Sequence, residues 1–415
     1  MPSASSAPTL PFLERLLDGE KVEWKTLGEV CDRTKGTKIT ATQMKAMHKS
    51  NAPVKIFAGG QTFALVDYND LPQNDIYFFP SIIVKSRGII EFEYYDKPFS
   101  HKSEMWSYHT NSPDVNAKFL YYYLKTREDY FQQLGSVMQM PQISIPTTEK
   151  FPIPIPPLRV QSRIVEILDK FTQLEAELEA ELEARNKQYD FYRNRLLDFA
   201  LRDDLKGQVE WKTLGEVCVH LRTGLNPRRN FKLNTEDASN YYVTVRELGG
   251  TELLYSEKTD LINDEALQLI NNRSKLKVND ILFSGTGTIG KTAFISKEPT
   301  NWNIKEGVYA LTLDTHYVLP MFVLRYLQTQ STIDWIDRMA AGGIVRSITI
   351  KNLEQLPIPL PPLSEQRRIV DILDRFDTLT NSISEGLPRE IALRRKQYEY
   401  YRDALLNFPR PTPTA

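Results

Sequence analysis

FPIPIPPLRVQSRIVEILDKFTQLEAELEAELEARNKQYDFYRNRLLDF, residues 151–199, is the stretch that decides the fold. It opens with a proline-rich segment, which we expect to form a short polyproline II rod. From Arg159 the chain has no Gly or Pro until Gly207, and apolar residues recur in steps of three and four, which predicts a long helix. These apolar residues are Ile164, Leu168, Phe171, Leu174, Leu178 and Leu182. About 40 residues at about 1.5 Å each give a rod about 60 Å long, and its single apolar stripe needs a partner.

The last part of the chain repeats this text and supplies the partner. Residues 356–408 read LPIPLPPLSEQRRIVDILDRFDTLTNSISEGLPREIALRRKQYEYYRDALLNF. The apolar residues with helical spacing are here Ile369, Leu373, Phe376 and Leu379. We therefore predict that the two long helices form an intramolecular antiparallel coiled coil. Gly386 and Pro388 within SEGLPRE are expected to break or kink the second helix.

Three phrases occur twice, so the chain is an internal duplication with a pseudo-two-fold repeat. VEWKTLGEVC begins at Val22 and again at Val209, 187 residues later. PIPIPPL and PIPLPPL lie 205 residues apart, and KQYDFYR and KQYEYYR lie 209 residues apart. Between these shared ends, residues 34–139 and 223–346 barely resemble one another. Constant ends with divergent middles indicate one scaffold that carries two different tips.

Both tips are expected to be mixed α/β domains. Short β-rich runs bounded by Gly, Pro, Asn and Asp predict strands, at Ile76–Val84, Ile89–Tyr95, Tyr241–Val245, Asp280–Ser284 and Val308–Leu313. Each tip also contains one predicted helix, Lys118–Leu134 or Met321–Met339. We therefore assign the chain to the α+β class, with two globular mixed α/β domains separated by the two long helices.

Composition excludes several classes of protein. The chain has 415 residues, enough for two or three domains, with a net charge of −1 and 41% hydrophobic residues. It has no apolar run long enough to span a membrane, and MPSASSAPTL lacks the basic and apolar parts of a signal peptide, so we expect a cytoplasmic protein. Cys31 and Cys218 hold equivalent places in the repeat and are expected to be small buried residues rather than a disulfide or a zinc site.

GTGTIGKT, residues 285–292, matches the phosphate-binding P-loop pattern. That site needs a helix whose N-terminus faces the phosphates. Here the next residues, TAFISKEPTNW, are β-rich and reach a proline at 299, which predicts a hairpin instead. A Gly-rich hairpin turn offers backbone amides, hydroxyl groups and one cation to DNA. The side chains concerned are Ser284, Thr286, Thr288 and Lys291.

Other polar turns are candidates for the same role. The first tip has a strand–turn–strand, IIVKSRGIIEF, and Arg at such a turn is the usual bidentate reader of guanine. The candidate DNA-binding residues of the first tip are Arg33, Lys35, Lys38, Lys85, Ser86, Arg87, Gly88, Gln139 and Gln142. Those of the second tip are Arg222, Arg228, Arg229, Ser284, Thr286, Thr288, Lys291, Arg346 and Ser347. The alternative for each turn is a solvated loop without a ligand.

The sequence contains no catalytic pattern. The five histidines show no metal-ligand spacing, and neither G-x-S-x-G nor H-E-x-x-H occurs. No Asn or Asp is followed by Pro-Pro and an aromatic residue, the pattern of a methyltransferase site. We therefore expect a non-catalytic chain with no metal ligands. The acidic run LEAELEAELEA, residues 174–184, argues against the central helix itself lying along DNA.

These phrases and their duplication resemble the specificity (S) subunit of type I restriction–modification systems. The resemblance covers nearly the whole chain: WKTLGEV at the start of both halves, PIPLPPLSEQRRIVDILDRFDTLT with its partial copy, and RKQYEYYRDALLNF at the end. The four-residue repeat of the central helix and the SEGLPRE passage are most similar to the type IC group.

The resemblance implies that the chain recognises DNA for partner subunits. In that family, two target recognition domains each bind one half of a bipartite, asymmetric site on double-stranded DNA. The helices set the half-site spacing and dock two methyltransferase (M) subunits, which methylate adenine N6 with S-adenosylmethionine. Restriction (R) subunits, which use ATP and Mg, then join the complex to translocate and cut DNA. The chain itself is expected to hold none of these cofactors.

The resemblance also implies domain boundaries. They are a leader with a short helix at 1–23, recognition domains at 24–157 and 209–362, spacer helices at 158–208 and 363–409, and a disordered tail at 410–415. Two other functions stay open on the sequence alone. One is a P-loop ATPase with coiled-coil arms, and the other is a solitary DNA-binding regulator or structural linker without M partners.

Overall fold

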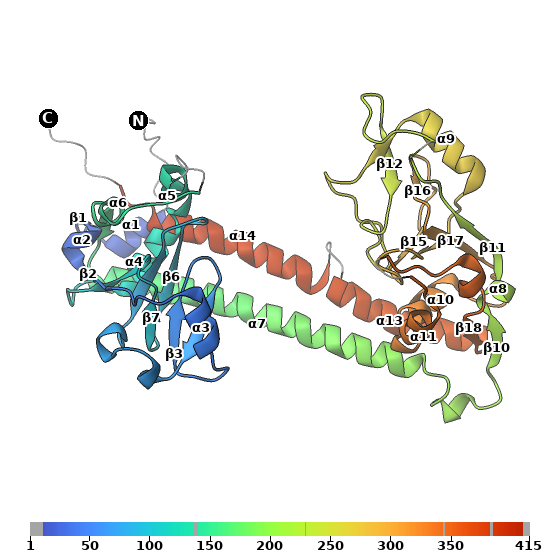
Figure 1. The fold of residues 1–415 in the computed structure, drawn as a ribbon, viewed down its shortest axis with the longest axis horizontal. Helices are drawn as coiled ribbons and strands as arrows, with labels where there is room; N and C mark the ends of the chain where they lie inside the picture. Colours follow the sequence, from blue (N-terminus) through green and yellow to red (C-terminus); the bar gives the residue numbers. More distant parts are fainter. Residues whose placement is uncertain (1–10, 136–139, 229, 343–344, 382–384, 410–415) are drawn as a thin grey trace. The chain divides into compact units, whose positions relative to one another are not determined.

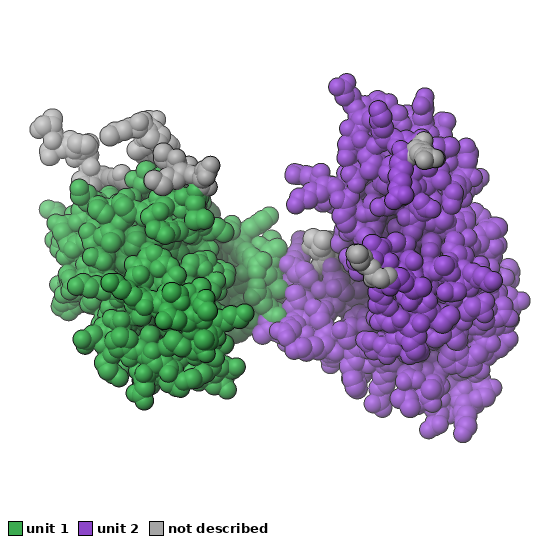
Figure 2. Space-filling view, in the orientation of Figure 1, with its two compact units in different colours: residues 1–179, 390–415 green, residues 180–389 purple. Residues whose placement is uncertain are grey.

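The computed structural model of the chain describes residues 11–135, 140–228, 230–342, 345–381 and 385–409. They form two compact units (Figure 2). Unit 1 comprises residues 1–179 and 390–415, and unit 2 comprises residues 180–389. Helices α7, Leu158–Leu196, and α14, Gly386–Leu406, each contribute residues to both units. Each unit therefore contains part of both long helical segments predicted from the sequence.

The centre of each unit is a four-stranded antiparallel sheet, and both sheets have the same strand order. In unit 1 the order is β2-β8-β5-β6, with β2 at Cys31–Arg33, β8 at Trp106–Thr110, β5 at Ser81–Lys85 and β6 at Glu91–Tyr95. In unit 2 it is β11-β17-β14-β15, with β11 at Cys218–Thr223, β17 at Val308–Leu313, β14 at Ile281–Ser284 and β15 at Thr292–Phe294. The two tips thus share one sheet topology despite their unlike sequences.

A second, three-stranded sheet accompanies each four-stranded one. It has the order β4-β3-β7 in unit 1, with β4 at Phe63–Val66, β3 at Val54–Phe57 and β7 at Phe99–His101. In unit 2 it has the order β13-β12-β16, with β13 at Leu261–Ile262, β12 at Asn240–Val243 and β16 at Trp302–Ile304. In both units the middle strand is antiparallel to one neighbour and parallel to the other. The correspondence therefore extends to strand direction.

The proline-rich segments form β-strands, so the predicted free polyproline rods are wrong. Strand β9, Pro152–Ile155, pairs antiparallel with β1, Glu23–Thr26, and β18, Pro357–Leu360, pairs in the same way with β10, Glu210–Thr213. Proline and an aliphatic residue alternate in both strands. In a strand, every second residue directs its N–H group to the same side. The prolines, which have no N–H group, therefore occupy the side of the strand that pairs with no neighbour, and no ladder hydrogen bond is lost.

Each tip has two consecutive helices where one was predicted. They are α4, Ala117–Lys125, and α5, Glu128–Gly135, in unit 1, and α10, Pro320–Leu327, and α11, Gln330–Met339, in unit 2. In unit 2 the hydroxyl of Thr329 accepts a hydrogen bond from the N–H of Thr332 and so caps the start of the second helix. Figure 1 shows α4 beside strand β6 of the central sheet.

In unit 1 the helices α7 and α14 run antiparallel and close one core with the tip. Phe171 of α7 contacts Tyr401 and Tyr398 of α14, whereas the later residue Glu175 contacts the earlier residue Arg395. The core of unit 1 contains Val160, Ile164 and Leu168 from α7, Leu405 and Leu406 from α14, Phe408 beyond it, and Phe119 from α4. The C-terminal part of the chain is therefore a structural part of the first tip.

Unit 2 has the same arrangement, formed by α13, Leu363–Asn381, and the C-terminal part of α7. Helix α13 provides Ile369 and Leu373 to the core, and the end of α7 provides Tyr189, followed by Leu197. Phe376 contacts Tyr189 and Tyr192, as Phe171 contacts its two tyrosines in unit 1. The predicted helix break is present: α13 ends at Asn381 and α14 begins at Gly386. Each unit therefore contains its own contacts between the two long helical segments.

The remaining elements are short. In unit 1 they are α1 at Pro11–Leu17, α2 at Leu27–Val30, α3 at Ala41–Met47, α6 at Ile145–Glu149 and two 3₁₀ turns at Tyr68–Asp70 and Gln73–Asp75. In unit 2 they are α8 at Leu214–Val217, α9 at Asp264–Arg273, α12 at Ile350–Leu353 and a 3₁₀ turn at Asp203–Leu205. The α+β class is confirmed. Within the described ranges no helix is long and apolar enough to cross a membrane.

The two cysteines are free thiols. Burial raises the pKa of Cys31 and of Cys218 to about 12. Neither thiol is therefore reactive near neutral pH. Among the residues that the structure describes, no cluster of His, Cys, Asp and Glu is suited to hold a metal ion.

Candidate functional site

The turn between β5 and β6 of unit 1 forms backbone hydrogen bonds with residues 140–143, which lie between α5 and β9 in the chain. Gly88 has a φ of +75°, a conformation that favours glycine. Its N–H donates to the carbonyl of Pro141 at 2.8 Å, and the N–H of Ile143 donates to the carbonyl of Ser86 at 3.0 Å. Two segments that are more than 50 residues apart in sequence therefore form one small ladder, in which Arg87 lies opposite Gln142.

Unit 2 builds the same ladder from different residues. Gly287 has a φ of +79°. Its N–H donates to the carbonyl of Arg346 at 2.9 Å, and the N–H of Ile348 donates to the carbonyl of Gly285 at 2.9 Å. Thr286 lies opposite Ser347. We call each of these features the clamped turn: residues 86–89 with 140–143 in unit 1, and residues 285–288 with 345–348 in unit 2.

The two clamped turns share a backbone and differ in side chains. The ladder makes Arg87 equivalent to Thr286, Ile89 to Thr288, Met140 to Val345, Pro141 to Arg346 and Gln142 to Ser347. Most of these side chains are exposed. A single frame thus presents a guanidinium group and apolar groups in unit 1, and mainly hydroxyl groups with a different arginine in unit 2.

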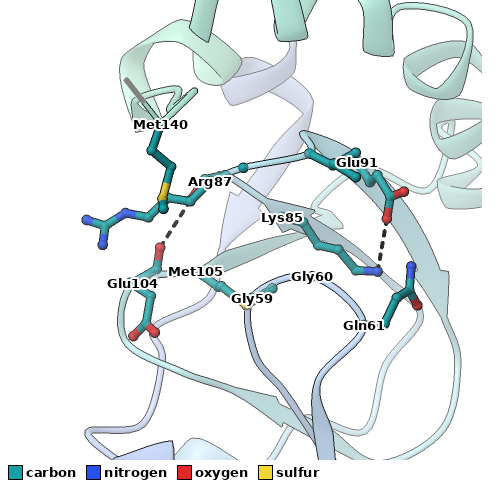
Figure 3. A pocket seen from close by; sticks show the side chains of 12 residues that line it. Gly59, Gly60, Gln61, Lys85, Arg87, Glu91, Glu104, Met105 and Met140 are labelled. Atoms are coloured by element: carbon teal, nitrogen blue, oxygen red, sulfur yellow. Dashed lines mark hydrogen bonds and ion pairs between the residues drawn. The ribbon is translucent and has the colours of Figure 1, made fainter. Parts of the chain in front are cut away.

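A hollow lies beside each clamped turn. In unit 1 its volume is about 400 Å³, and Ile89, Met105 and Met140 line it together with Gly59 and Gly60, which follow β3. In Figure 3 the guanidinium of Arg87 is directed away from the side chain of Lys85, on the side where Met140 lies. The hollow of unit 2 has a volume of about 420 Å³ and is lined by Thr286, by residues 244–246 that follow β12, and by others. Both tips are therefore concave at the same place in the fold.

Lys85 and Ser86 do not have the exposed positions that the sequence suggested. Lys85 is only 5% exposed and forms ion pairs with Glu91 (Figure 3) and with Glu93, each at 3.1 Å. Burial favours the neutral amine, but the hydrogen bonds that the ammonium group donates to these two carboxylates outweigh it and raise the pKa of Lys85. The buried hydroxyl of Ser86 donates to the carbonyl of Glu104 at 3.2 Å. As a correction to the sequence-based site, both side chains hold the sheet together and are not available to DNA.

The P-loop-like segment of unit 2 is a hairpin, as predicted. Strand β15 begins at Thr292, where a nucleotide-binding loop would have a helix. Ser284 is fully buried: its hydroxyl donates to the carbonyl of Thr288 at 2.6 Å and accepts from the N–H of Lys291 at 2.8 Å. Ser284 therefore shapes the turn from inside, which corrects its placement among the DNA contacts. The side chains of Thr286, Thr288 and Lys291 are exposed.

The early basic loops are partly engaged within the tips. Arg33 forms an ion pair with Glu149 at 3.4 Å and remains one-third exposed, whereas Lys35 and Lys38 are exposed. Arg222 is mostly buried and donates to the carboxylate of Asp280 at 2.7 Å and to the hydroxyl of Thr312 at 2.6 Å. This pairing gives Arg222 a structural role and corrects its earlier placement. Arg228 is exposed.

Two predicted positions, Gln139 and Arg229, lie outside the described residues, as does the predicted tail at 410–415. Of the returning residues, Gln142 and Arg346 are exposed and Ser347 is half-buried, and all three belong to the clamped turns. No local sequence pattern indicates that these residues meet the hairpin turns. It also missed three exposed apolar residues there, Ile89, Met140 and Val345, because only polar side chains were considered.

Comparison with known proteins identifies the family. The family described as "Type I restriction modification DNA specificity domain" matches residues 19–184 and again residues 207–393. The chain belongs to this family. Membership assigns it to DNA sequence recognition within a type I restriction–modification system, as the non-catalytic specificity subunit. The interpretation as a P-loop ATPase is not supported.

Curated relatives cover almost the whole chain. The specificity subunit of the type I restriction enzyme EcoR124I/EcoR124II from Escherichia coli is 36% identical over an alignment 417 residues long, gaps included, which covers 97% of this chain and 98% of that protein. A putative specificity subunit from Haemophilus influenzae, S.HindORF215P, is 31% identical over 412 residues, 96% of this chain and 98% of that protein. The duplication and both tips are therefore part of the similarity.

Solved structures show the same fold at lower sequence identity. The S subunit of a type I restriction–modification system from M. genitalium has a TM-score of 0.56 and 17% identity, and the match covers 95% of this chain and 98% of that one. A chain from a study of complex assembly in the type I R-M system has a TM-score of 0.58 and 18% identity, with coverage of 94% and 98%. Both likenesses support the two-tip architecture within the family.

Proposed function

We propose that units 1 and 2 each bind one half of a bipartite, asymmetric site on double-stranded DNA. The observation that carries this proposal is the clamped turn, which has the same backbone ladder in both units and different exposed side chains. Base readout depends on which side chains reach the edges of the bases. Two identical frames with unlike side chains therefore support two readers of the same kind with different specificities.

The DNA-contacting residues of this proposal belong to the clamped turns, to the hairpin turn between β14 and β15 and to the early loops, and most of them are exposed. They are Arg33, Lys35, Lys38, Arg87, Gly88 and Gln142 in unit 1, and Arg228, Thr286, Thr288, Lys291, Arg346 and Ser347 in unit 2. Lysine and arginine on loops supply contacts to phosphates, and an exposed guanidinium such as that of Arg87 is the usual reader of guanine. The ion pair of Arg346 with Asp337, at 3.0 Å, is exposed and so costs little to exchange for DNA.

The long helices are proposed to set the distance between the half-sites and to dock two M subunits, to which R subunits are added. The paired helix segments in both units and the acidic repeat 174–184, which disfavours DNA along the helix, support a spacer role. That repeat and the SEGLPRE passage also support the type IC group. We infer a cytoplasmic location, because the complex acts on chromosomal and incoming DNA.

A genome-wide map of N6-methyladenine tests the recognition function. Cells with the gene should show one bipartite methylated motif that is absent after its deletion. One added LEAE unit lengthens the central helix by about 6 Å, a little under two base-pair steps. The variant should then methylate the same two half-sites with a longer spacer, and altered half-sites with an unchanged spacer would refute the proposal.

A further inference from the structure

The clamped turn of unit 1 presents two apolar side chains to solvent. Ile89 is 71% exposed and Met140 is 64% exposed. They come from the two different segments of the ladder and line the same hollow. Apolar groups of this size are stabilised by burial, so this exposed pair at the tip of the turn offers apolar contact area to a ligand.

The electrostatics around this pair favour a partner that offers guanine-like acceptors. Glu91 and Glu93 neutralise Lys85 inside the sheet, and Glu104 is paired with Lys102 at 2.5 Å. Arg87, between Ser86 and Gly88 of the clamped turn, is exposed and carries its positive charge on the rim of the hollow. The hollow thus combines one available guanidinium with two apolar side chains.

This combination matches one feature of the major groove of DNA. The thymine 5-methyl group is the apolar group on the base edges, and arginine is the preferred bidentate ligand of guanine N7 and O6. We propose that unit 1 recognises its half-site by placing Ile89 and Met140 against a thymine methyl group while Arg87 reads a neighbouring guanine. The proposal rests on the proposed function, since it names the chemistry by which the first tip reads its half-site.

The equivalent positions of unit 2 provide the contrast. Thr288 stands where unit 1 has Ile89, and Thr286 stands where unit 1 has Arg87. Threonine hydroxyl groups bond to several base edges and therefore specify a base less sharply than a bidentate arginine does. Val345, the counterpart of Met140, is the apolar member of this set in unit 2, so the second half-site is read by one apolar side chain rather than two. Changes at Ile89 and Met140 should leave that half-site untouched.

The test uses the complete complex with its M subunits and duplexes in which single thymines of the first half-site are replaced by deoxyuridine, which lacks the methyl group. With the wild-type complex, one such replacement should weaken binding about fourfold, the value of one buried methyl group. With the double variant Ile89→Ser, Met140→Ser, the same replacement should have no effect, because neither side chain retains a methyl group to contact the thymine. Replacements in the second half-site should affect both complexes equally.

Arg87→Lys keeps the charge but loses the bidentate geometry. Methylation of sites with a substituted guanine in the first half-site should then rise relative to the wild-type site by about tenfold. The matched control is Phe78→Ser, which removes an exposed apolar side chain that precedes the opposite end of β5 and should leave the deoxyuridine effect unchanged.

The outcomes separate this inference from the proposed function. If the wild-type complex binds its bipartite motif but deoxyuridine weakens binding equally in the wild type and the double variant, the methyl contact is wrong and the recognition function stands. If the double variant fails to assemble with M subunits in size-exclusion chromatography, the apolar pair is a protein interface and the inference is overturned. If the wild-type complex has no bipartite motif, the proposed function itself fails.

Discussion

Units 1 and 2 differ most in sequence where they agree most in backbone. Their tips have the same strand order and the same ladder at the clamped turn, although the sequences between the shared ends are unlike. Within the scaffold the side chains agree as well: Phe171 and its two tyrosines correspond to Phe376 and its two tyrosines. The frame and the side chains that it displays are thus separable, as a modular reader of DNA requires.

One scaffold position departs from this agreement. In unit 1 the hydroxyl of Tyr122 donates to Asp169 at 2.6 Å. In unit 2 the equivalent residue is Arg325, which is 2% exposed and donates to Asp374, Asp377 and the hydroxyl of Tyr189. Asp169 also pairs with Lys118, which is one-third exposed, at 2.8 Å. The joint between tip and helices therefore has a partly exposed cation in unit 1 and a buried cation in unit 2.

The largest expected effect comes from removing this arginine. Arg325→Met leaves two carboxylates without their buried partner, and we expect a loss of about 3 kcal/mol in the free energy of unfolding. Tyr122→Phe removes one hydrogen bond to a charged group and should cost about 1.5 kcal/mol. Urea unfolding of the two variants provides the measurement. Equal losses would show that the ionic joint has no special weight in unit 2.

Gln161→Met and Gln366→Met should each cost about 2 kcal/mol, because each leaves buried backbone groups without a partner. Both glutamines are fully buried, and each bonds three backbone groups of the adjoining loop and helix start. As the two share no partner, the double variant should cost the sum. Gln173→Met, at an exposed position of α7, is the control and should change stability by less than about 0.5 kcal/mol.

The clamped turn should tolerate only residues that accept its backbone conformation. Gly88→Val places a β-branched residue at a φ of +75° and should cost about 1.5 kcal/mol. It should also weaken methylation directed by the first half-site. Gly88→Asn, which tolerates this conformation, should retain both stability and motif. If the valine variant behaves like the asparagine variant in both measurements, the turn does not depend on its left-handed glycine.

A smaller effect should distinguish the units by pH. Burial would raise the pKa of Glu93, but hydrogen bonds from Lys85 and Lys55 outweigh it and lower this pKa. The ionised carboxylate therefore stabilises unit 1 at pH values above the ordinary pKa of a glutamate, about 4.3, and this stabilisation should be lost as the pH falls below that value.

Lys85→Met should flatten this part of the pH dependence of urea unfolding. Ser284 holds the equivalent place in unit 2 and has no charge, so Ser284→Ala should leave the pH dependence as it is. If Ser284→Ala, and not Lys85→Met, removed the loss of stability at acid pH, the titrating group would lie in unit 2, and the prediction would be wrong.

The repeated phrases predicted the scaffold well because helical spacing and duplication are local signals. They failed at PIPIPPL, where pairing with Glu23–Thr26 converts the expected rod into a strand. The candidate site was predicted only in part. Lys85 and Arg87 are both basic residues near the same predicted turn, and their sequence does not distinguish them. Lys85 is the last residue of β5 and is buried by its ion pairs with β6, whereas Arg87 lies beyond the strand and is exposed. The ladder from Gly88 to Pro141 is a long-range contact that no local pattern reveals.

The most direct test is the methylation motif of a chain in which residues 36–143 replace residues 224–348. The junctions are equivalent: Gly36 and Gly224 both pass close to a backbone carbonyl, of Lys102 and Ile304 respectively, and Ile143 and Ile348 both close the ladder. If the tips read DNA independently on a shared scaffold, the methylated motif should contain the first half-site twice and the second not at all. A motif that still contains the second half-site would contradict this conclusion.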